Sequence, residues 1–246
     1  MRRIAFFPIL VLSMLAAPFT VSCSSDNQSS SSAQVLDPTQ AHYGNADDAW
    51  GTLWWKWVYD MPQTAGKCFI PFQDPTGASC RTGQSGDVFF LAGTSAGTVV
   101  RDQCTIPSGK AIFFPILTFD ADNGGVPQNM LMSDAALMGV VQMQMDAVPV
   151  SGLSAEFDGA PIMDLARFRT DLTMFDYTLS PEPNTYTCEG AMGVTGTISP
   201  SYQAGYYIML PPPSLGSHTL HFAGSSPKSM PPLNVDVTYH FTVTAT

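Results

Sequence analysis

Residues 235–244 read Val-Asp-Val-Thr-Tyr-His-Phe-Thr-Val-Thr, and the alternation in this stretch decides the fold class. Every second side chain is apolar, which places these side chains together on one face of an extended strand. A strand that is buried on one face only is typical of an antiparallel sheet. The segment 217–222, separated from it by a loop that contains Gly and Pro, predicts the partner strand of a long hairpin.

Further short strands are expected upstream. Apolar runs at 88–92 and 111–119 are bounded by Gly and Pro, which is the pattern of buried strands, and residues 153–158 alternate before an Asp-Gly turn signal. We therefore expect a mainly β α+β fold. Its expected form is an antiparallel Ig-like β-sandwich with a core at about 150–246 and one or two N-terminal helices packed on it.

Two amphipathic helices are predicted. The first would begin after Asn45, an N-cap residue, and end before Pro62. Its apolar face repeats at helical spacing and is rich in indoles: Trp50, Trp54 and Trp57. The second helix is expected over 133–147, where apolar residues recur at the same spacing before a proline.

The composition fits an exported protein and argues against a nucleic-acid binder. The 246 residues carry a formal net charge of −10, and only 12% of them are charged. Ordinary globular chains carry about 25% charged residues, so the surface here is completed largely by uncharged polar residues. Because an acidic chain is repelled by phosphate backbones, we expect no nucleic-acid partner.

The N-terminus has the features of an export signal. A cationic start precedes an apolar run over 4–19, which is shorter than the about 20 residues of a membrane span. The run leads into Thr-Val-Ser-Cys at 20–23, which resembles a bacterial lipobox. This resemblance implies a lipoprotein signal peptide over 1–22 and makes Cys23 the lipidated first residue of the mature chain. The alternative is an ordinary cleavable signal that leaves Cys23 as a free thiol.

The chain after this cysteine indicates a tether and a single folded unit. Residues 24–34 are polar and rich in Ser, and we expect a lipidated linker over 23–40. The rest, 41–246, predicts one β-rich globular domain. These features together predict an exported bacterial protein whose N-terminal lipid holds it to a membrane, at the outer membrane or the cell surface.

Four further cysteines predict disulfides. An oxidising compartment favours two bridges, for which three pairings exist. Cys80 and Cys104 flank an expected strand and are favoured by their closeness in the chain, which leaves Cys68 with Cys188. A bridge between Cys80 and Cys104 would close a loop of about 25 residues and contribute roughly 3 kcal/mol.

Three motifs resemble those of a family of exported bacterial proteins whose function is uncharacterised. They are Trp-x-x-x-Trp-Trp-x-Trp over 50–57, Cys-Thr-Ile-Pro-Ser-Gly-Lys-Ala-Ile-Phe-Phe-Pro over 104–115, and Gly-Ser-His-Thr-Leu-His-Phe over 216–222. The resemblance covers most of 50–246. It implies no activity, so it transfers no catalytic residue.

A Gly-x-Ser-x-Gly motif at 93–97 raises the alternative of a secreted serine hydrolase. The motif follows an expected strand, as a nucleophile elbow does, and Ser95 would be the nucleophile with a C-terminal histidine such as His218. However, an elbow leads into a helix, whereas 98–107 is rich in β-branched residues and ends at a proline. Repeated βα units are also missing from the sequence. A Gly-rich strand turn is the favoured interpretation.

Three further features have a binding interpretation beside a structural one. Trp55 points away from the helix face that carries the other indoles, so it either packs in the core or stacks on a sugar ring. The loop 120–125 offers oxygen ligands for Ca²⁺ but lacks the EF-hand glutamate, so a hydrogen-bonded Asx turn is favoured. His218 and His221 fall on opposite faces of a strand, and no metal site is expected.

The sequence thus predicts a lipid-anchored protein of the cell envelope with a non-catalytic binding or structural role. A glycan or a protein is the expected ligand, with Trp55 as the binding residue, and no cofactor is expected. The alternative is an esterase-like hydrolase that uses Ser95.

Overall fold

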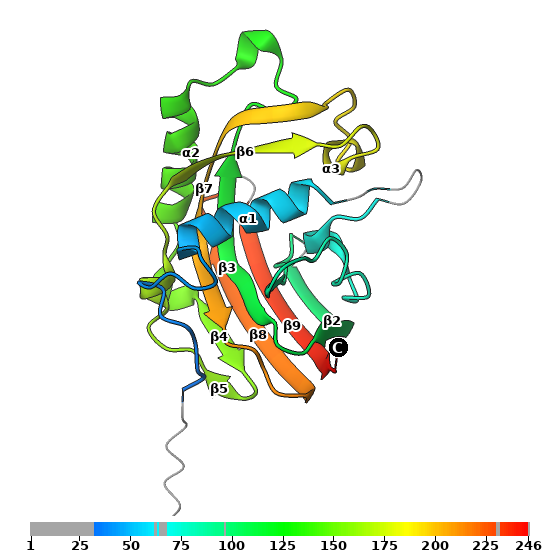
Figure 1. Ribbon diagram of the computed structural model, residues 1–246. Helices are drawn as coiled ribbons and strands as arrows, with labels where there is room; N and C mark the ends of the chain where they lie inside the picture. Colours follow the sequence, from blue (N-terminus) through cyan, green and yellow to red (C-terminus); the bar gives the residue numbers. More distant parts are fainter. Residues whose placement is uncertain (1–31, 62, 64–67, 96, 230–231, 246) are drawn as a thin grey trace, which may run out of the picture.

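The computed structural model describes residues 32–61, 63, 68–95, 97–229 and 232–245. They form a mainly β α+β fold with two mixed sheets and three α-helices (Figure 1). The predicted signal peptide, the lipobox and most of the Ser-rich tract lie outside the described residues.

The first sheet has four strands in the order β1-β3-β7-β6. Their bounds are β1 Val88–Phe90, β3 Ala111–Ala121, β7 Gly196–Leu210 and β6 Thr173–Leu179. The long strand β7 pairs with β6 along its first half and with β3 along its second half, both antiparallel, and it bends between the two (Figure 1). Strand β1 lies parallel to β3 at the opposite edge.

The second sheet has five strands in the order β2-β9-β8-β4-β5. Their bounds are β2 Gly97–Pro107, β9 Leu233–Thr244, β8 Gly216–Ser226, β4 Ser154–Phe157 and β5 Ala160–Pro161. The predicted hairpin between β8 and β9 is confirmed, and the five apolar side chains that alternate along β9 are buried.

The expected purely antiparallel sandwich is wrong in two respects. Strands β2 and β9 pair in parallel, as do β1 and β3. Both sheets also take strands from the first half of the chain, so the sheets extend well beyond about 150–246. Alternation reports which face of a strand is buried, and it carries no information on the direction of the neighbouring strand.

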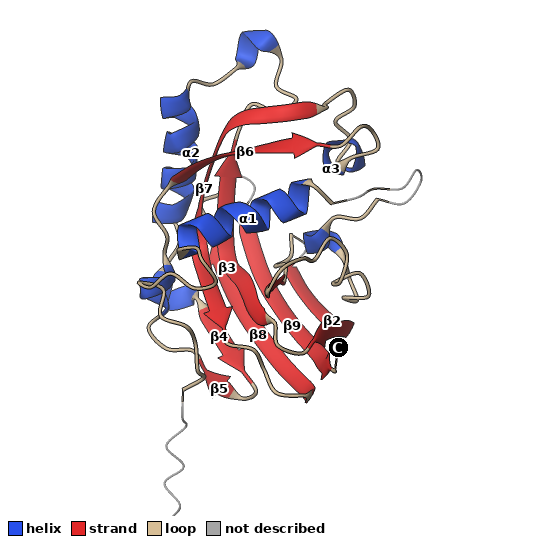
Figure 2. Ribbon diagram, in the orientation of Figure 1, coloured by secondary structure: helices blue, strands red, loops and turns tan. Residues whose placement is uncertain are grey.

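The helices cover the first sheet from both sides (Figure 2). Helix α1 spans Asp47–Tyr59, α2 spans Asp134–Asp146 and the short α3 spans Thr185–Cys188, with 3-10 turns η1 Pro71–Gln73, η2 Gln128–Met130, η3 Val150–Gly152 and η4 Leu165–Phe168. Helix α1 lies across one face, and α2 packs on the other face beside the second sheet. No helix in these described ranges has the length and hydrophobicity needed to cross a membrane.

Capping differs between the two long helices. The Ser133 hydroxyl accepts from the Ala136 N–H at 3.3 Å, which confirms the predicted start of α2. Helix α1 starts one residue later than expected, because Ala46 is its N-cap and Asn45 forms a β-bridge with His42 instead. Without a capping side chain, α1 depends on Asp47 and Asp48 in its first turn to match the positive end of the helix dipole.

The first sheet separates two hydrophobic cores. The inter-sheet core lies between the two sheets and under α2, and it includes Ile112, Phe114, Val141, Ile208, Phe222 and Val237. The α1 core lies under α1, and it includes Trp50, Trp54, Trp57, Phe113, Tyr207 and Met209. Successive residues of β3 and β7 point alternately into one core and the other, which explains why these strands show no polar alternation.

A β-bulge in β3 changes which residues face α1. The pairing with β7 shifts between Pro115 and Leu117, so that Ile116 and Leu117 both enter the inter-sheet core. The extra residue turns the next polar side chains, Thr118 and Asp120, toward α1.

Both favoured disulfides are present. Cys80 is bonded to Cys104 and Cys68 to Cys188, over sequence separations of 24 and 120. The first bridge belongs to the inter-sheet core, and the second ties the chain after α1 to α3.

The chain joins the folded domain earlier than predicted. The Ala33 N–H donates to Pro161 O at 3.0 Å, and the Leu36 N–H donates to Met209 O at 2.9 Å. Val35 packs against the inter-sheet core. The expected boundary at residue 41 is therefore too late, because the first apolar residues after the polar tract already contact the sheets.

Candidate functional site

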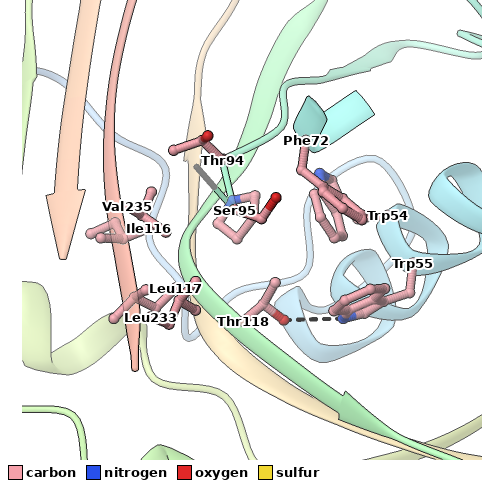
Figure 3. A pocket seen from close by; sticks show the side chains of 12 residues that line it. Trp54, Trp55, Phe72, Thr94, Ser95, Ile116, Leu117, Thr118, Leu233 and Val235 are labelled. Carbon is pink, nitrogen blue, oxygen red and sulfur yellow. Dashed lines mark hydrogen bonds between the residues drawn. The ribbon is translucent and has the colours of Figure 1, made fainter. Parts of the chain in front are cut away.

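A pocket of about 160 Å³ lies at the bulge in β3, and we call it the bulge pocket. Trp54 and Trp55 of α1 form one side, and the opposite side comes from β3 and the start of β9 (Figure 3). Its lining also includes Phe72 of η1 and the loop after β1, at residues 93–95. Because Ser95 is exposed, the pocket reaches the surface beside it.

The two indoles are fixed by hydrogen bonds to the elements around them. Trp54 is 2% exposed and donates from Nε1 to Leu91 O at 2.9 Å. Trp55 donates from Nε1 to the Thr118 hydroxyl at 3.0 Å, and its ring stacks on Tyr59 with centroids 5.6 Å apart. Since each indole has its polar atom bonded, the rings present apolar surface to the pocket.

The loop that carries Ser95 is held by a buried arginine. Arg101 is 1% exposed and donates from Nη2 to Gly93 O at 2.9 Å and from Nη1 to Ala92 O at 2.6 Å. Its guanidinium also donates to the Tyr239 hydroxyl and lies 5.0 Å from the centre of that ring. Sequence reasoning missed this residue, although a charge at an inward-facing position of a strand was a usable signal.

The pocket offers little polar chemistry. The Thr118 hydroxyl accepts from Trp55 Nε1 and lies 2.5 Å from the Tyr207 hydroxyl and 3.2 Å from Ala204 O, so it is already satisfied. The Ser95 hydroxyl makes no hydrogen bond to any described residue. Ser95 is therefore the polar group that a bound molecule would meet at the rim.

The structure does not bring Ser95 and His218 together. Ser95 precedes Gly97, which pairs with Val235 at the start of β9, whereas His218 pairs with Phe241 near its end. Six residues of strand separate these two registers, a distance of about 20 Å. Strand β2 begins at Gly97, two residues after Ser95, so a strand and not a helix follows the motif, which lacks the form of a nucleophile elbow.

Each C-terminal histidine has an aspartate partner elsewhere on the second sheet. The pairs are His218–Asp158 at 2.7 Å, His221–Asp236 at 3.0 Å and His240–Asp102 at 2.6 Å. His218 stacks on Phe157 with ring centroids 5.4 Å apart, whereas the His221 side chain is 39% exposed on the outer face. This confirms that the two side chains lie on opposite faces of β8.

The exposed sugar platform expected of Trp55 is absent. Trp55 is only 8% exposed, because the bulge brings Thr118 within reach of its indole N–H and Tyr59 covers one face of its ring. A sugar needs an open ring face, which Trp55 does not offer here. Its place in the lining of the bulge pocket is the remaining route to a ligand.

The loop 120–125 is an Asx turn held by tyrosines. Asp122 Oδ1 accepts from the Gly124 N–H at 2.6 Å, and Asp122 Oδ2 accepts from the Tyr177 hydroxyl at 2.7 Å. Asp120 accepts from the Tyr59 hydroxyl at 2.6 Å, and burial raises the pKa of Asp120 to about 7. Among the described residues, no three His, Cys, Asp or Glu side chains are placed to share a metal ion.

Comparison with known proteins adds no family. No protein-family model matches the chain, and no curated protein sequence matches it either. The solution structure of amebosin aligns with 62% of this chain and 96% of its own, at 10% sequence identity and a TM-score of 0.17. A likeness at that level supports no conclusion about function, so the resemblance to exported bacterial proteins stays a prediction.

Proposed function

We propose that this protein is an exported, lipid-anchored binding protein of the bacterial envelope. Its bulge pocket would take one small aromatic or branched aliphatic group, without catalysis. The observation that carries the proposal is a surface-reaching pocket whose walls are almost wholly apolar and whose free polar group is the Ser95 hydroxyl.

The size of the pocket limits the ligand. An apolar cavity of about 150 Å³ accepts benzene, so about 160 Å³ suits a single ring or a Leu-sized group. A pyranose carries a hydroxyl on nearly every carbon, and the pocket would leave most of these unpaired. The geometry therefore favours an apolar small molecule or a side chain of a protein partner over a glycan.

The rim hydroxyl specifies a further property of the ligand. A molecule that fills the pocket places one end beside Ser95, where a hydroxyl or carbonyl oxygen would gain a hydrogen bond. The buried indoles at the other end favour the edge or face of an aromatic ring. A substituted phenol has both features.

A direct binding experiment tests the proposal. We expect p-cresol to change the fluorescence of Trp54 and Trp55 in the purified mature protein, with a Kd of about 1 mM or tighter, equivalent to roughly 4 kcal/mol. Toluene should bind several-fold more weakly because it leaves Ser95 unpaired, and glucose should not bind. Binding of glucose at the same residues would contradict the apolar assignment.

Two variants locate the binding. Ser95→Phe should fill the pocket from its rim and abolish p-cresol binding, because the new ring occupies the same space. Ser217→Phe, on the exposed outer side of β8, is the matched control and should bind as the wild type does. Equal p-cresol affinity in both variants would show that the ligand lies elsewhere.

A labelling experiment separates binding from hydrolysis. A fluorophosphonate reacts with an activated serine, and activation requires a base within hydrogen-bond reach of the hydroxyl. We expect no labelling of Ser95. Labelling that disappears in Ser95→Ala would establish the hydrolase alternative.

The lipid anchor is tested on the intact chain. We expect the mature N-terminus to be Cys23 carrying acyl chains, detected as added mass on the first tryptic peptide. Cys23→Ser should then appear in the soluble fraction instead of the membrane. An unmodified mature chain in the culture fluid would contradict the anchor and leave the proposal for the pocket intact.

A further inference from the structure

A second cavity lies at the start of α1 and shares no lining residue with the bulge pocket. Its volume is about 290 Å³, and its walls come from the first residues of α1 and from the end of η4 with the chain after it. We call it the α1 N-terminal pocket. Charged side chains of both signs line it: Asp47, Asp48, Asp171, Arg167 and Arg169.

Asp47 is buried in this pocket without a hydrogen-bond partner. It is 6% exposed, and neither carboxyl oxygen bonds to another described residue; Oδ1 is fully enclosed, so a ligand would reach the carboxyl through Oδ2. Burial raises the pKa of Asp47 to about 6, a shift that His42 partly opposes. An ionised carboxylate in this setting is costly, and a cationic hydrogen-bond donor in the cavity would remove that cost.

The neighbouring Asp48 differs, because both of its carboxyl oxygens accept hydrogen bonds. Asp48 Oδ1 accepts from the Ala49 N–H at 2.9 Å, and Asp48 Oδ2 accepts from the Thr173 hydroxyl at 3.5 Å. Its role is to hold the first turn of α1 and to join α1 to β6. Asp47 is thus the acid in this wall that a ligand cation would satisfy.

Arg167, on another wall of the pocket, supplies a positive charge for a ligand anion. The Arg167 guanidinium lies 4.8 Å from the centre of the Phe168 ring and forms no ion pair within the described ranges. Arg169, in contrast, is paired with Asp146 at 2.6 Å. A guanidinium recognises a carboxylate through paired N–H groups, so Arg167 can bind an anionic group that enters the pocket.

We propose that the α1 N-terminal pocket binds a small zwitterion of the α-amino acid type, whose ammonium donates to Asp47 and whose carboxylate accepts from Arg167. The two protein groups lie on different elements, α1 and η4, so the ligand would join the start of the helix to the turn beside it. This site is independent of the bulge pocket, and its test does not depend on the outcome there.

Calorimetry with matched probes tests the charge pattern. The common amino acids are titrated into the mature protein at about pH 7.5, where Asp47 is ionised. The tightest binder is then compared with its decarboxylated amine and its deaminated acid. We expect each half-probe to bind about tenfold more weakly or worse, because each loses one charge-assisted interaction. If no amino acid binds, or if a half-probe binds equally well, the proposal is wrong.

Two substitutions locate the site. Asp47→Asn and Arg167→Gln should each weaken binding by about tenfold or more. The matched controls are Asp60→Asn, at the other end of α1, and Arg81→Gln, which is exposed and outside this pocket, and both should bind normally. Wild-type affinity in folded Asp47→Asn would overturn the proposal.

The wild-type protein provides an independent readout. Lowering the pH from about 7.5 to about 5 should weaken binding about tenfold, because Asp47 protonates in this range while the ammonium and carboxylate of the ligand do not. The segments packed around Asp47 contribute the following charged or titratable groups: Asp37, His42, Asp48, Arg167, Arg169 and Asp171. His42 also faces Asp47, so His42→Gln must retain the fall in affinity. An affinity that does not change with pH would contradict the role of Asp47.

Discussion

The two faces of the four-stranded sheet are buried by different chemistry. The inter-sheet core is built mainly from aliphatic side chains and phenylalanines, and Ile112, Phe114 and Ile208 there are 0% exposed. The α1 core also contains aliphatic side chains and phenylalanines, but it is rich in indoles and phenols whose polar atoms are bonded. In that core Trp54 donates to Leu91 O, and the Tyr207 hydroxyl donates to Gln203 Oε1 at 2.8 Å.

This difference indicates separate roles for the two cores. One holds the layers together, and the other fixes the position of helix α1. Burial of aliphatic surface stabilises without direction, so the inter-sheet core holds the layers together. Hydrogen bonds of indole and phenol groups have a direction, so the α1 core fixes where the helix lies on the sheet. Residues of α1 line both candidate binding pockets, so both pockets lie beside the helix whose position these hydrogen bonds fix.

The largest expected effects come from the two disulfides, one in the inter-sheet core and one that ties the chain after α1 to α3. Removing Cys68–Cys188 with a pair of Ala substitutions should lower the free energy of unfolding by about 5 kcal/mol, and removing Cys80–Cys104 by about 3.5 kcal/mol. The difference follows from the separations of 120 and 24 residues that the bridges close. Urea denaturation of the two double variants measures it. A larger loss from the shorter loop would mean that native packing around Cys80 and Cys104 outweighs chain entropy.

The next effect tests the cohesion of the inter-sheet core. Phe222→Ala should cost about 3–5 kcal/mol, because the ring is 0% exposed and packs 4.8 Å from the Phe114 ring across the two sheets. Met174→Ala, at a residue that is 63% exposed, is the control and should change the free energy of unfolding little. If Phe222→Ala cost no more than this control, the layers would not depend on the contact between the two rings.

Much of the inter-sheet architecture could be predicted because its signals are local. The alternation over 235–243, the Ser133 cap of α2 and the disulfide pairs each depend on residues close in sequence or on elimination. Strand β7 could not be predicted, because it is buried on both faces and carries Ser201 and Gln203 toward α1 at 0% exposure. Their burial makes sense only once α1 lies over them.

The candidate site was predicted only in parts. Ser95 and Trp55 were both singled out from the sequence, for catalysis and for sugar stacking, and the structure places both in one apolar pocket. What the sequence did not contain was the register shift that turns Thr118 toward Trp55, and the buried Arg101 that holds the Ser95 loop. The contact between Trp55 and Thr118 joins residues 63 positions apart, and the buried guanidinium of Arg101 also contacts Tyr239, 138 positions away.

A smaller effect is expected from the α1 core, whose hydrogen bonds fix the position of helix α1. Trp54→Phe keeps an aromatic ring but removes the N–H that donates to Leu91 O, so a buried carbonyl loses its partner. We expect a loss of about 2 kcal/mol in the free energy of unfolding, together with weaker p-cresol binding because α1 is less firmly placed. Trp57→Phe is the matched comparison, since its N–H donates to Thr82 O outside the pocket lining. It should lose stability without losing p-cresol affinity.

The smallest effect is a pH dependence of stability that arises from Asp120, on the α1 side of the four-stranded sheet. Burial raises the pKa of Asp120 from 3.8 to about 7. Between about pH 4 and pH 7 the folded state therefore holds a proton that the unfolded state has released, and stability falls as the pH rises through this window. Because Asp120 is partly exposed and Tyr59 donates to it, we expect the change to be about 1–2 kcal/mol.

Two variants isolate the contribution of Asp120 from that of other titrating groups. Asp120→Asn cannot ionise, so its stability relative to the wild type should increase as the pH rises from about 4 to about 8. Tyr59→Phe removes the hydroxyl that lowers the pKa of Asp120, so the pH-dependent loss should extend to higher pH. Phe222→Ala, in the inter-sheet core, should shift the whole stability curve by a constant. A pH-independent difference between Asp120→Asn and the wild type would mean that the carboxyl is ionised at no cost, and that polar groups under α1 are as well solvated as those on the surface.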